Sequence, residues 1–223
     1  MERSKITKYL KTYKKRTTPY RNQLDFQLAI CYTLLGEYDQ AQRLYENNFL
    51  DMFASPKLWK KSGQPYWLID ICVLSGRLDL LADVKSELND YKSDKLGNSP
   101  AALYANAMTD LLLSSKSDIS ISIFGLLKDP RIKICIALGE ALNSIIANNQ
   151  PAFESALINL LEVHEGQATR GSLRSTPEGW LCMSAMSLAY VAQLHNFQVK
   201  VVNDYLNLGY LEFLLLRGKP TKH

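Results

Sequence analysis

The residues most able to perform acid–base or metal chemistry are far apart in this chain. The three histidines, His164, His195 and His223, are widely separated, and no HExxH pattern or cysteine–histidine pair has metal-ligand spacing. The motifs GxGxxG, GxxxxGK[ST] and GxSxG are also absent. We therefore expect no enzymatic activity, no metal and no cofactor, although a site assembled only in three dimensions stays open. His164 continues an apolar helical row, which favours a hydrogen-bonded residue at the edge of the core over a ligand or base.

A row of carboxylates is the most suggestive surface feature. They recur at i, i+4, i+8, i+11 and i+15 along the helix expected from Leu78, and they are Asp79, Asp83, Glu87, Asp90 and Asp94. The opposite face of that helix is apolar and is expected to face the core. Like charges four residues apart destabilise a helix by a few tenths of a kcal/mol per pair. This acidic ridge could therefore serve to attract a basic partner, and a solvated face without a partner is the alternative.

The basic residues are concentrated at the N-terminus. Residues 1–21 hold eight of the 26 lysines and arginines but only one of the 22 acidic residues, so residues 22–223 are mildly acidic. Ile6, Leu10 and Tyr13 share one face of the helix expected there. This basic arm either binds an acidic partner, lipid or nucleic acid, or docks its apolar face while its lysines stay solvated. Because the rest of the chain is not basic, we expect no general nucleic-acid binding.

The four cysteines and the apolar segments indicate a cytoplasmic protein. Cys31, Cys72, Cys135 and Cys182 lie far apart in apolar helical runs, as expected for buried reduced thiols. The N-terminus has no apolar stretch of the signal-peptide type. The longest apolar run, residues 180–194, is shorter than the roughly 20 residues that a membrane span needs. We expect no membrane association.

Pairs of helices recur at a spacing near 40 residues. A helix over 22–35, a turn at Gly36–Asp39 and a return helix through Asn47 form the first pair, which resembles a single tetratricopeptide unit. Gly76–Asp79 repeats this turn, and further pairs are expected over 101–127 and 131–164. This pattern predicts an all-α fold of stacked antiparallel αα-hairpins in one compact domain over 22–223.

The C-terminal part is expected to contain the most buried helix. In the pair over 131–164, the second helix begins at Pro151 and carries one apolar row, formed by Phe153, Ala156, Leu157, Leu160, Leu161 and His164. After a loop over 166–172, Ser175–Glu178 predicts the start of a nearly all-apolar helix over 179–194, which should lie at the centre of this half. A short extended segment over 197–201 and a last helix, capped by Asn203 or Asp204, should follow.

The segment 132–211, most clearly from Ala137, resembles the Imm49 family of bacterial immunity proteins. The positions that carry the resemblance are Phe153, Leu157, Leu161, His164, Gly179–Leu181, Ala185, Ala189, Gln198–Val201 and Asp204–Leu206. The sequence departs from the pattern at two places. A glycine turn is expected at His195–Phe197, and proline often follows Tyr-Leu at the position of Asn207. The resemblance implies an all-α protein that binds and neutralises a cognate toxin without catalytic residues.

Three functional hypotheses follow. The first is a cytoplasmic immunity protein that blocks a cognate protein toxin by stoichiometric occlusion. The second is a tetratricopeptide-like adaptor that binds a protein or peptide in a concave groove, but the first helices of the hairpins are mostly apolar where such a groove needs asparagine or lysine. The third is nucleic-acid binding by the basic arm, which deletion of residues 1–16 would abolish.

Overall fold

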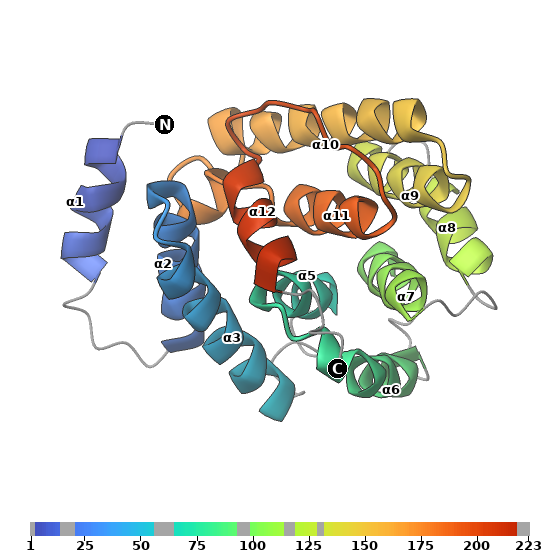
Figure 1. The fold of residues 1–223 in the computed structure, drawn as a ribbon, viewed down its shortest axis with the longest axis horizontal. Helices are drawn as coiled ribbons and strands as arrows, with labels where there is room; N and C mark the ends of the chain where they lie inside the picture. The colour runs from blue at the N-terminus through green and yellow to red at the C-terminus, as the bar shows by residue number, and fades with distance from the viewer. Residues whose placement is uncertain are drawn as a thin grey trace.

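The computed structural model describes residues 3–13, 21–55, 65–92, 99–113, 119–128 and 132–217, and this part of the chain is all-α, without a strand (Figure 1). The α-helices are α1 (Arg3–Tyr13), α2 (Arg21–Leu35), α3 (Tyr38–Ala54), α5 (Pro65–Ser75), α6 (Leu81–Lys92), α7 (Pro100–Leu112), α8 (Ile119–Leu127), α9 (Lys133–Ile146), α10 (Gln150–Arg170), α11 (Met183–Leu194) and α12 (Leu208–Arg217). Two short 3₁₀ helices, η1 (Leu78–Leu80) and η2 (Pro177–Gly179), complete the set. None of the described helices combines the length and apolar character needed to cross a bilayer.

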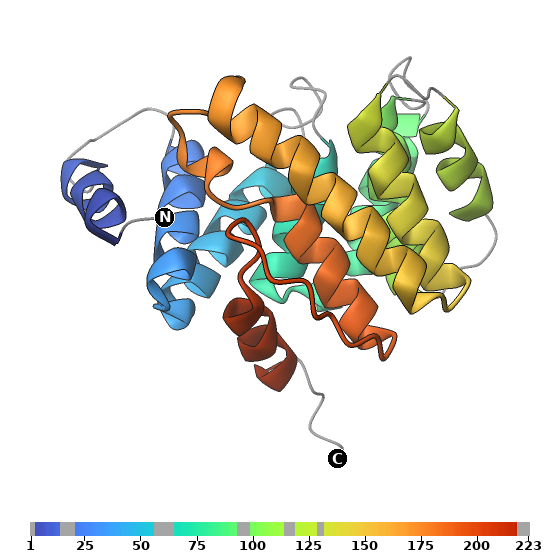
Figure 2. The same cartoon turned by 90° about the horizontal axis from the view of Figure 1, so that it is seen from above.

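Consecutive helices pack against each other, as the repeated pattern predicts. The closest neighbours are α2 with α3, α9 with α10, α3 with α5, and α7 with α8. The hairpins lie side by side along the length of the molecule (Figures 1 and 2). The expected fold of stacked αα-hairpins is therefore confirmed.

Four helices end in the same way, with one residue in the left-handed conformation. Gly36 (φ 80°), Gly76 (φ 76°), Asn148 (φ 51°) and Asn196 (φ 67°) follow α2, α5, α9 and α11. In each case the amide of the next residue donates to the carbonyl five residues back, at 2.8–3.2 Å. These hydrogen bonds satisfy carbonyl groups at the end of the helix that would otherwise lack partners. Asn196 thus supplies the turn that glycine was expected to supply, because asparagine tolerates a positive φ.

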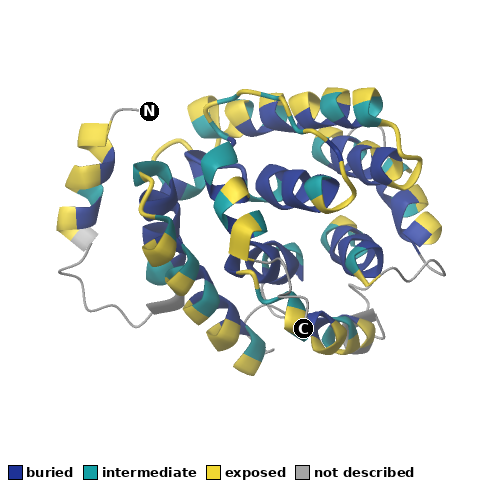
Figure 3. Ribbon diagram, in the orientation of Figure 1, coloured by how far each residue is buried: buried dark blue, intermediate teal, exposed yellow. Residues whose placement is uncertain are grey.

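Helix α11 is surrounded by other helices (Figure 3). Every residue from Ala185 to Ala192 is buried, and α11 packs against α5, α9, α10 and α12. The prediction of a central apolar helix is confirmed, but its predicted start is wrong. Residues 177–179 form η2, and the helix begins only at Met183, because the Cys182 amide donates to the Tyr205 carbonyl (2.9 Å). This hydrogen bond between residues distant in sequence holds residues 180–182, which lie between η2 and α11, out of the helix.

Three other predicted boundaries are wrong. Helix α3 continues to Ala54 because Phe49 and Met52 extend its buried face. Helix α10 continues through the expected loop to Arg170. Residue Asn207, rather than Asn203 or Asp204, caps α12: its Oδ1 accepts the Tyr210 amide (2.9 Å). The segment 197–201, expected to be extended, has no assigned secondary structure and pairs with no strand among the described residues.

The N-terminal helix α1 docks on α2 by its apolar face. Ile6 and Leu10 are buried, whereas the described lysines of α1 are exposed. The Tyr9 ring packs edge-on against Trp180 (5.4 Å between centroids), and Lys5 lies over the same indole at 5.7 Å. Trp180 is therefore the core anchor that its sequence context favours. The Tyr13 side chain and the cluster Lys14–Arg16 lie outside the described residues.

Candidate functional site

Three of the five residues of the acidic ridge, Asp79, Asp83 and Glu87, have described side chains. Arg77 binds Asp79 with two hydrogen bonds of 2.8 and 2.9 Å and also reaches Glu46 at 3.1 Å. The Asp83 side chain is exposed and Glu87 is half-buried. The Asp90 side chain and Asp94 lie outside the described part of the chain. The inward face is as predicted, because Leu81, Val84 and Leu88 are buried. Asp83 and Glu87 lie between these buried positions.

Lys85, which lies between these two carboxylates in sequence, turns the other way. Its ammonium forms an ion pair with Asp110 of α7 at 2.6 Å, without the alignment of a hydrogen bond. The Asp110 side chain is only 1% exposed. This pair joins α6 to α7, so Lys85 does not neutralise the outward carboxylates.

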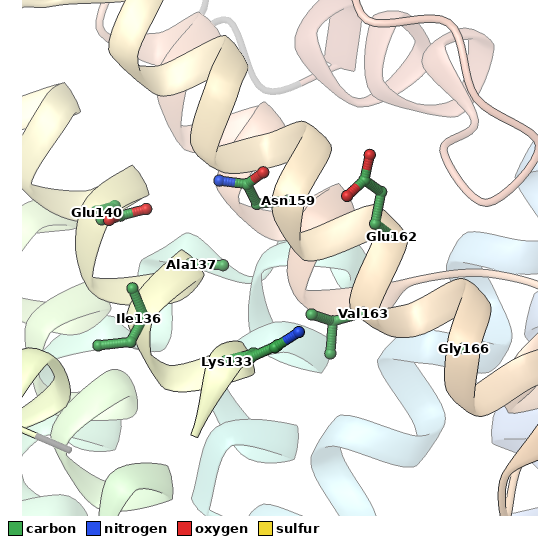
Figure 4. Close-up of a pocket in the computed structure, with 8 residues that line it drawn as sticks. All are labelled: Lys133, Ile136, Ala137, Glu140, Asn159, Glu162, Val163 and Gly166. Carbon is green, nitrogen blue, oxygen red and sulfur yellow. The ribbon is translucent and has the colours of Figure 1, made fainter. Parts of the chain in front are cut away.

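A second acidic surface, which the spacing did not reveal, lies between α9 and α10. It is a groove of about 620 Å³ with Ile136, Ala137 and Val163 on its apolar side. Glu140 projects from α9, and Asn159 and Glu162 project from α10 (Figure 4). Lys133 extends from the start of α9 toward Val163 in the same view. The sequence does show that these carboxylates fall between the buried positions of the two helices. Only the packing of α9 against α10 brings them to one groove.

An apolar pair on α8 is exposed. Ile121 is 70% exposed and Phe124 is 72% exposed, although α8 packs against α7 and α9. Two such residues three positions apart form one stripe on the outer face of a helix. Exposed apolar groups that gather on one surface are typical of protein-binding sites.

A buried carboxylate lies in the apolar helix α5. Asp70 is fully buried, and its two oxygens accept hydrogen bonds from the Tyr104 hydroxyl (2.9 Å) and the Ser184 hydroxyl (2.6 Å). Burial raises the pKa of Asp70 to about 6, and the hydroxyl donors oppose this shift. The sequence shows this aspartate inside the apolar run PYWLIDICVLS, a position from which a buried carboxylate could have been predicted.

The histidines and cysteines do not form a metal site among the described residues. His164 is buried, as its position in the apolar row predicts. Burial lowers the pKa of His164. The four cysteines are buried, and burial raises the pKa of three of them, Cys31, Cys72 and Cys182, to about 12.

Comparison of the chain with models of known protein families, with curated proteins and with solved structures gives no match.

Proposed function

We propose that this chain is an immunity protein that binds a cognate toxin and blocks it stoichiometrically, without turnover. Two things support the proposal: the resemblance of residues 132–211 to a family of immunity proteins, and the acidic groove within that same segment. The groove combines an apolar side with the carboxylates of Glu140 and Glu162. Such a surface is complementary to a basic element with an apolar stem, such as a lysine- or arginine-bearing segment of a toxin.

The adaptor hypothesis is disfavoured by the position of α11. In a tetratricopeptide-like adaptor, the first helices of the hairpins line a concave surface that receives a peptide. Here α11 packs against two of those first helices, α5 and α9, and is itself buried. The chain therefore fills with its own helix the surface that an adaptor would offer to a peptide.

The proposal is tested by co-expression with candidate toxins sought among the genes that neighbour this one. Cells that make the toxin domain should stop growing, and equimolar expression of this chain should restore growth. Native mass spectrometry should then detect a one-to-one complex. Protection by a small molar fraction of the chain, or toxin inactivation without a complex, would contradict stoichiometric occlusion.

Charge reversal separates the two acidic surfaces. The double variant Glu140→Lys/Glu162→Lys should weaken toxin binding at least tenfold, because attraction becomes repulsion. The loss of affinity should be larger at low salt, where charges are less screened. Asp83→Lys/Glu87→Lys is the matched variant on the ridge, and we expect it to weaken binding if the toxin also reaches α6. Neither pair should change the urea unfolding midpoint greatly, since these side chains are exposed or half-buried. Unchanged affinity in a titration removes the corresponding surface from the interface.

A further inference from the structure

A second cavity, separate from the acidic groove, lies where the first turns of α5, α7 and α9 meet the segment around η2. Its volume is about 450 Å³, within the range of small-ligand pockets. Its floor is buried and includes Tyr104, Leu160 and Leu181. Gln167 and Ser172, which also line it, are exposed, so the cavity opens to solvent on that side.

Aromatic side chains form much of its wall. Phe26, Tyr66, Trp67 and Tyr104 all line the cavity, and the rings of Phe26 and Trp67 lie 5.3 Å apart. Such rings offer apolar contact area and π faces that attract cations. The wall therefore suits a flat or apolar group that carries a positive charge.

His164 presents an unused hydrogen-bond acceptor in this wall. The residue is 7% exposed and its Nε2 has no hydrogen-bond partner among the described residues. Burial lowers the pKa of His164 and therefore favours the neutral ring, in which one nitrogen carries a proton and the other accepts. With the proton on Nδ1, Nε2 is an acceptor, and its burial without a donor costs free energy.

Glu178 presents a second unused acceptor. One of its oxygens, Oε1, accepts the Gln27 side-chain amide at 2.8 Å, and Gln27 in turn accepts the Tyr9 hydroxyl at 2.7 Å. Its other oxygen, Oε2, is buried and has no hydrogen-bond partner in the described part of the chain. The Gln27 contact holds one oxygen of the carboxylate, and Oε2 keeps its capacity to accept a hydrogen bond.

The described residues that line the cavity carry a negative charge. The described residues that line it include Glu178 but no lysine or arginine. Two lining residues, Tyr104 and Ser184, also hold the buried Asp70 carboxyl behind the wall. An anionic ligand would be repelled here, and a ligand with only acceptors would leave both unused acceptors unpaired.

We propose that this cavity binds a small organic cation, an amine, amidine or guanidine attached to an apolar or aromatic group, whose N–H donors reach His164 Nε2 and Glu178 Oε2. The apolar part packs among the aromatic rings, and the charge is neutralised by Glu178. The inference does not depend on toxin binding, because it concerns a different surface and a different ligand class.

Isothermal titration with benzamidine tests the proposal. Benzamidine offers a planar cation on an aromatic ring, whereas benzamide has the same shape without the charge and benzoate carries the opposite charge. We expect saturable one-to-one binding of benzamidine at millimolar or lower concentration, at least tenfold weaker binding of benzamide, and none of benzoate. The Trp67 indole N–H resonance should shift on benzamidine addition and report the location.

Two variants assign the acceptors. Glu178→Gln removes the charge but keeps an oxygen for Gln27, so the fold should persist while benzamidine affinity falls about ten- to a hundredfold. His164→Phe keeps a ring in the apolar row and removes Nε2. The matched control is Glu212→Gln, an exposed carboxylate of α12 outside both the cavity and the acidic groove, which should bind benzamidine as the wild type does. Absence of benzamidine binding to the wild type, equal affinity of a folded Glu178→Gln variant, or equal binding of benzamide would each overturn the proposal.

Discussion

Replacement of Asp70 by asparagine should make the protein less sensitive to pH. Burial raises the pKa of this carboxyl from 3.8 to about 6, so the folded chain keeps the proton to higher pH than the unfolded chain does. Low pH therefore favours the folded state through this group. The stabilisation is complete below pH 3.8 and is lost as the pH rises through about 6.

The size of the effect follows from the shift. Each pKa unit corresponds to about 1.4 kcal/mol, so loss of the proton from Asp70 costs the folded state about 3 kcal/mol between acidic and neutral pH. Asparagine has nearly the same shape and does not ionise. Its carbonyl can accept one of the two hydroxyls, from Tyr104 or Ser184, and its amide can donate to the oxygen of the other.

The assay is urea unfolding followed by circular dichroism at a series of pH values from acidic to neutral. The free energy of unfolding of Asp70→Asn, relative to the wild type, should rise by about 3 kcal/mol across this series. Asp83→Asn, which removes an exposed carboxylate, is the matched control for the loss of one aspartate. Parallel pH profiles of Asp70→Asn and the wild type would refute the reasoning, since the buried carboxyl would then titrate equally in both states.

Three further perturbations test the packing. Lys85→Met should destabilise the protein by about 3–5 kcal/mol in urea unfolding, because it leaves the buried Asp110 carboxylate unpaired; a loss below about 1 kcal/mol would contradict this. Asn207→Ala should cost about 2 kcal/mol in the same assay, since it removes the cap of α12 and a 2.9 Å hydrogen bond to the Thr33 carbonyl, whereas an unchanged midpoint would argue against both contacts. The buried thiols should react slowly with Ellman's reagent in the native protein and fast in denaturant, and rapid native labelling would contradict their burial.

Local patterns in the sequence predict the hairpins because each pattern depends only on residues within one helix or one turn. The row from Phe153 to His164 is buried at every predicted position, since a 3.6-residue period places those side chains on one face whatever the neighbours are. Gly36 and Gly76 end their helices as expected, because a positive φ is a property of one residue. Features of this kind depend on few residues close in the chain.

Features that depend on contacts between distant residues were not predictable. The start of α11 is set by the backbone hydrogen bond from Cys182 to Tyr205. The cap of α12 is Asn207, whose side chain also forms hydrogen bonds with Tyr38 and Thr33 of the first hairpin. The spacing of the carboxylates in the acidic ridge does not show that Arg77 pairs with Asp79. The cavity walls come from several helices, and no local pattern identifies them.

The small side chains of α11 determine which surfaces a partner can reach. Ala185 and Ala189 are fully buried, and their size lets neighbouring backbones approach α11 closely. The inner face of the hairpin series is thereby filled, and a macromolecular partner is restricted to the outer faces and the ends of the molecule. Two outer features differ from an ordinary solvated surface: the acidic groove between α9 and α10, and the exposed pair Ile121 and Phe124 on the adjoining α8. Because α8 packs directly on α9, a partner seated in the groove lies one helix away from an apolar contact. This adjacency favours the groove over the pair Asp83 and Glu87 as the centre of the proposed interface.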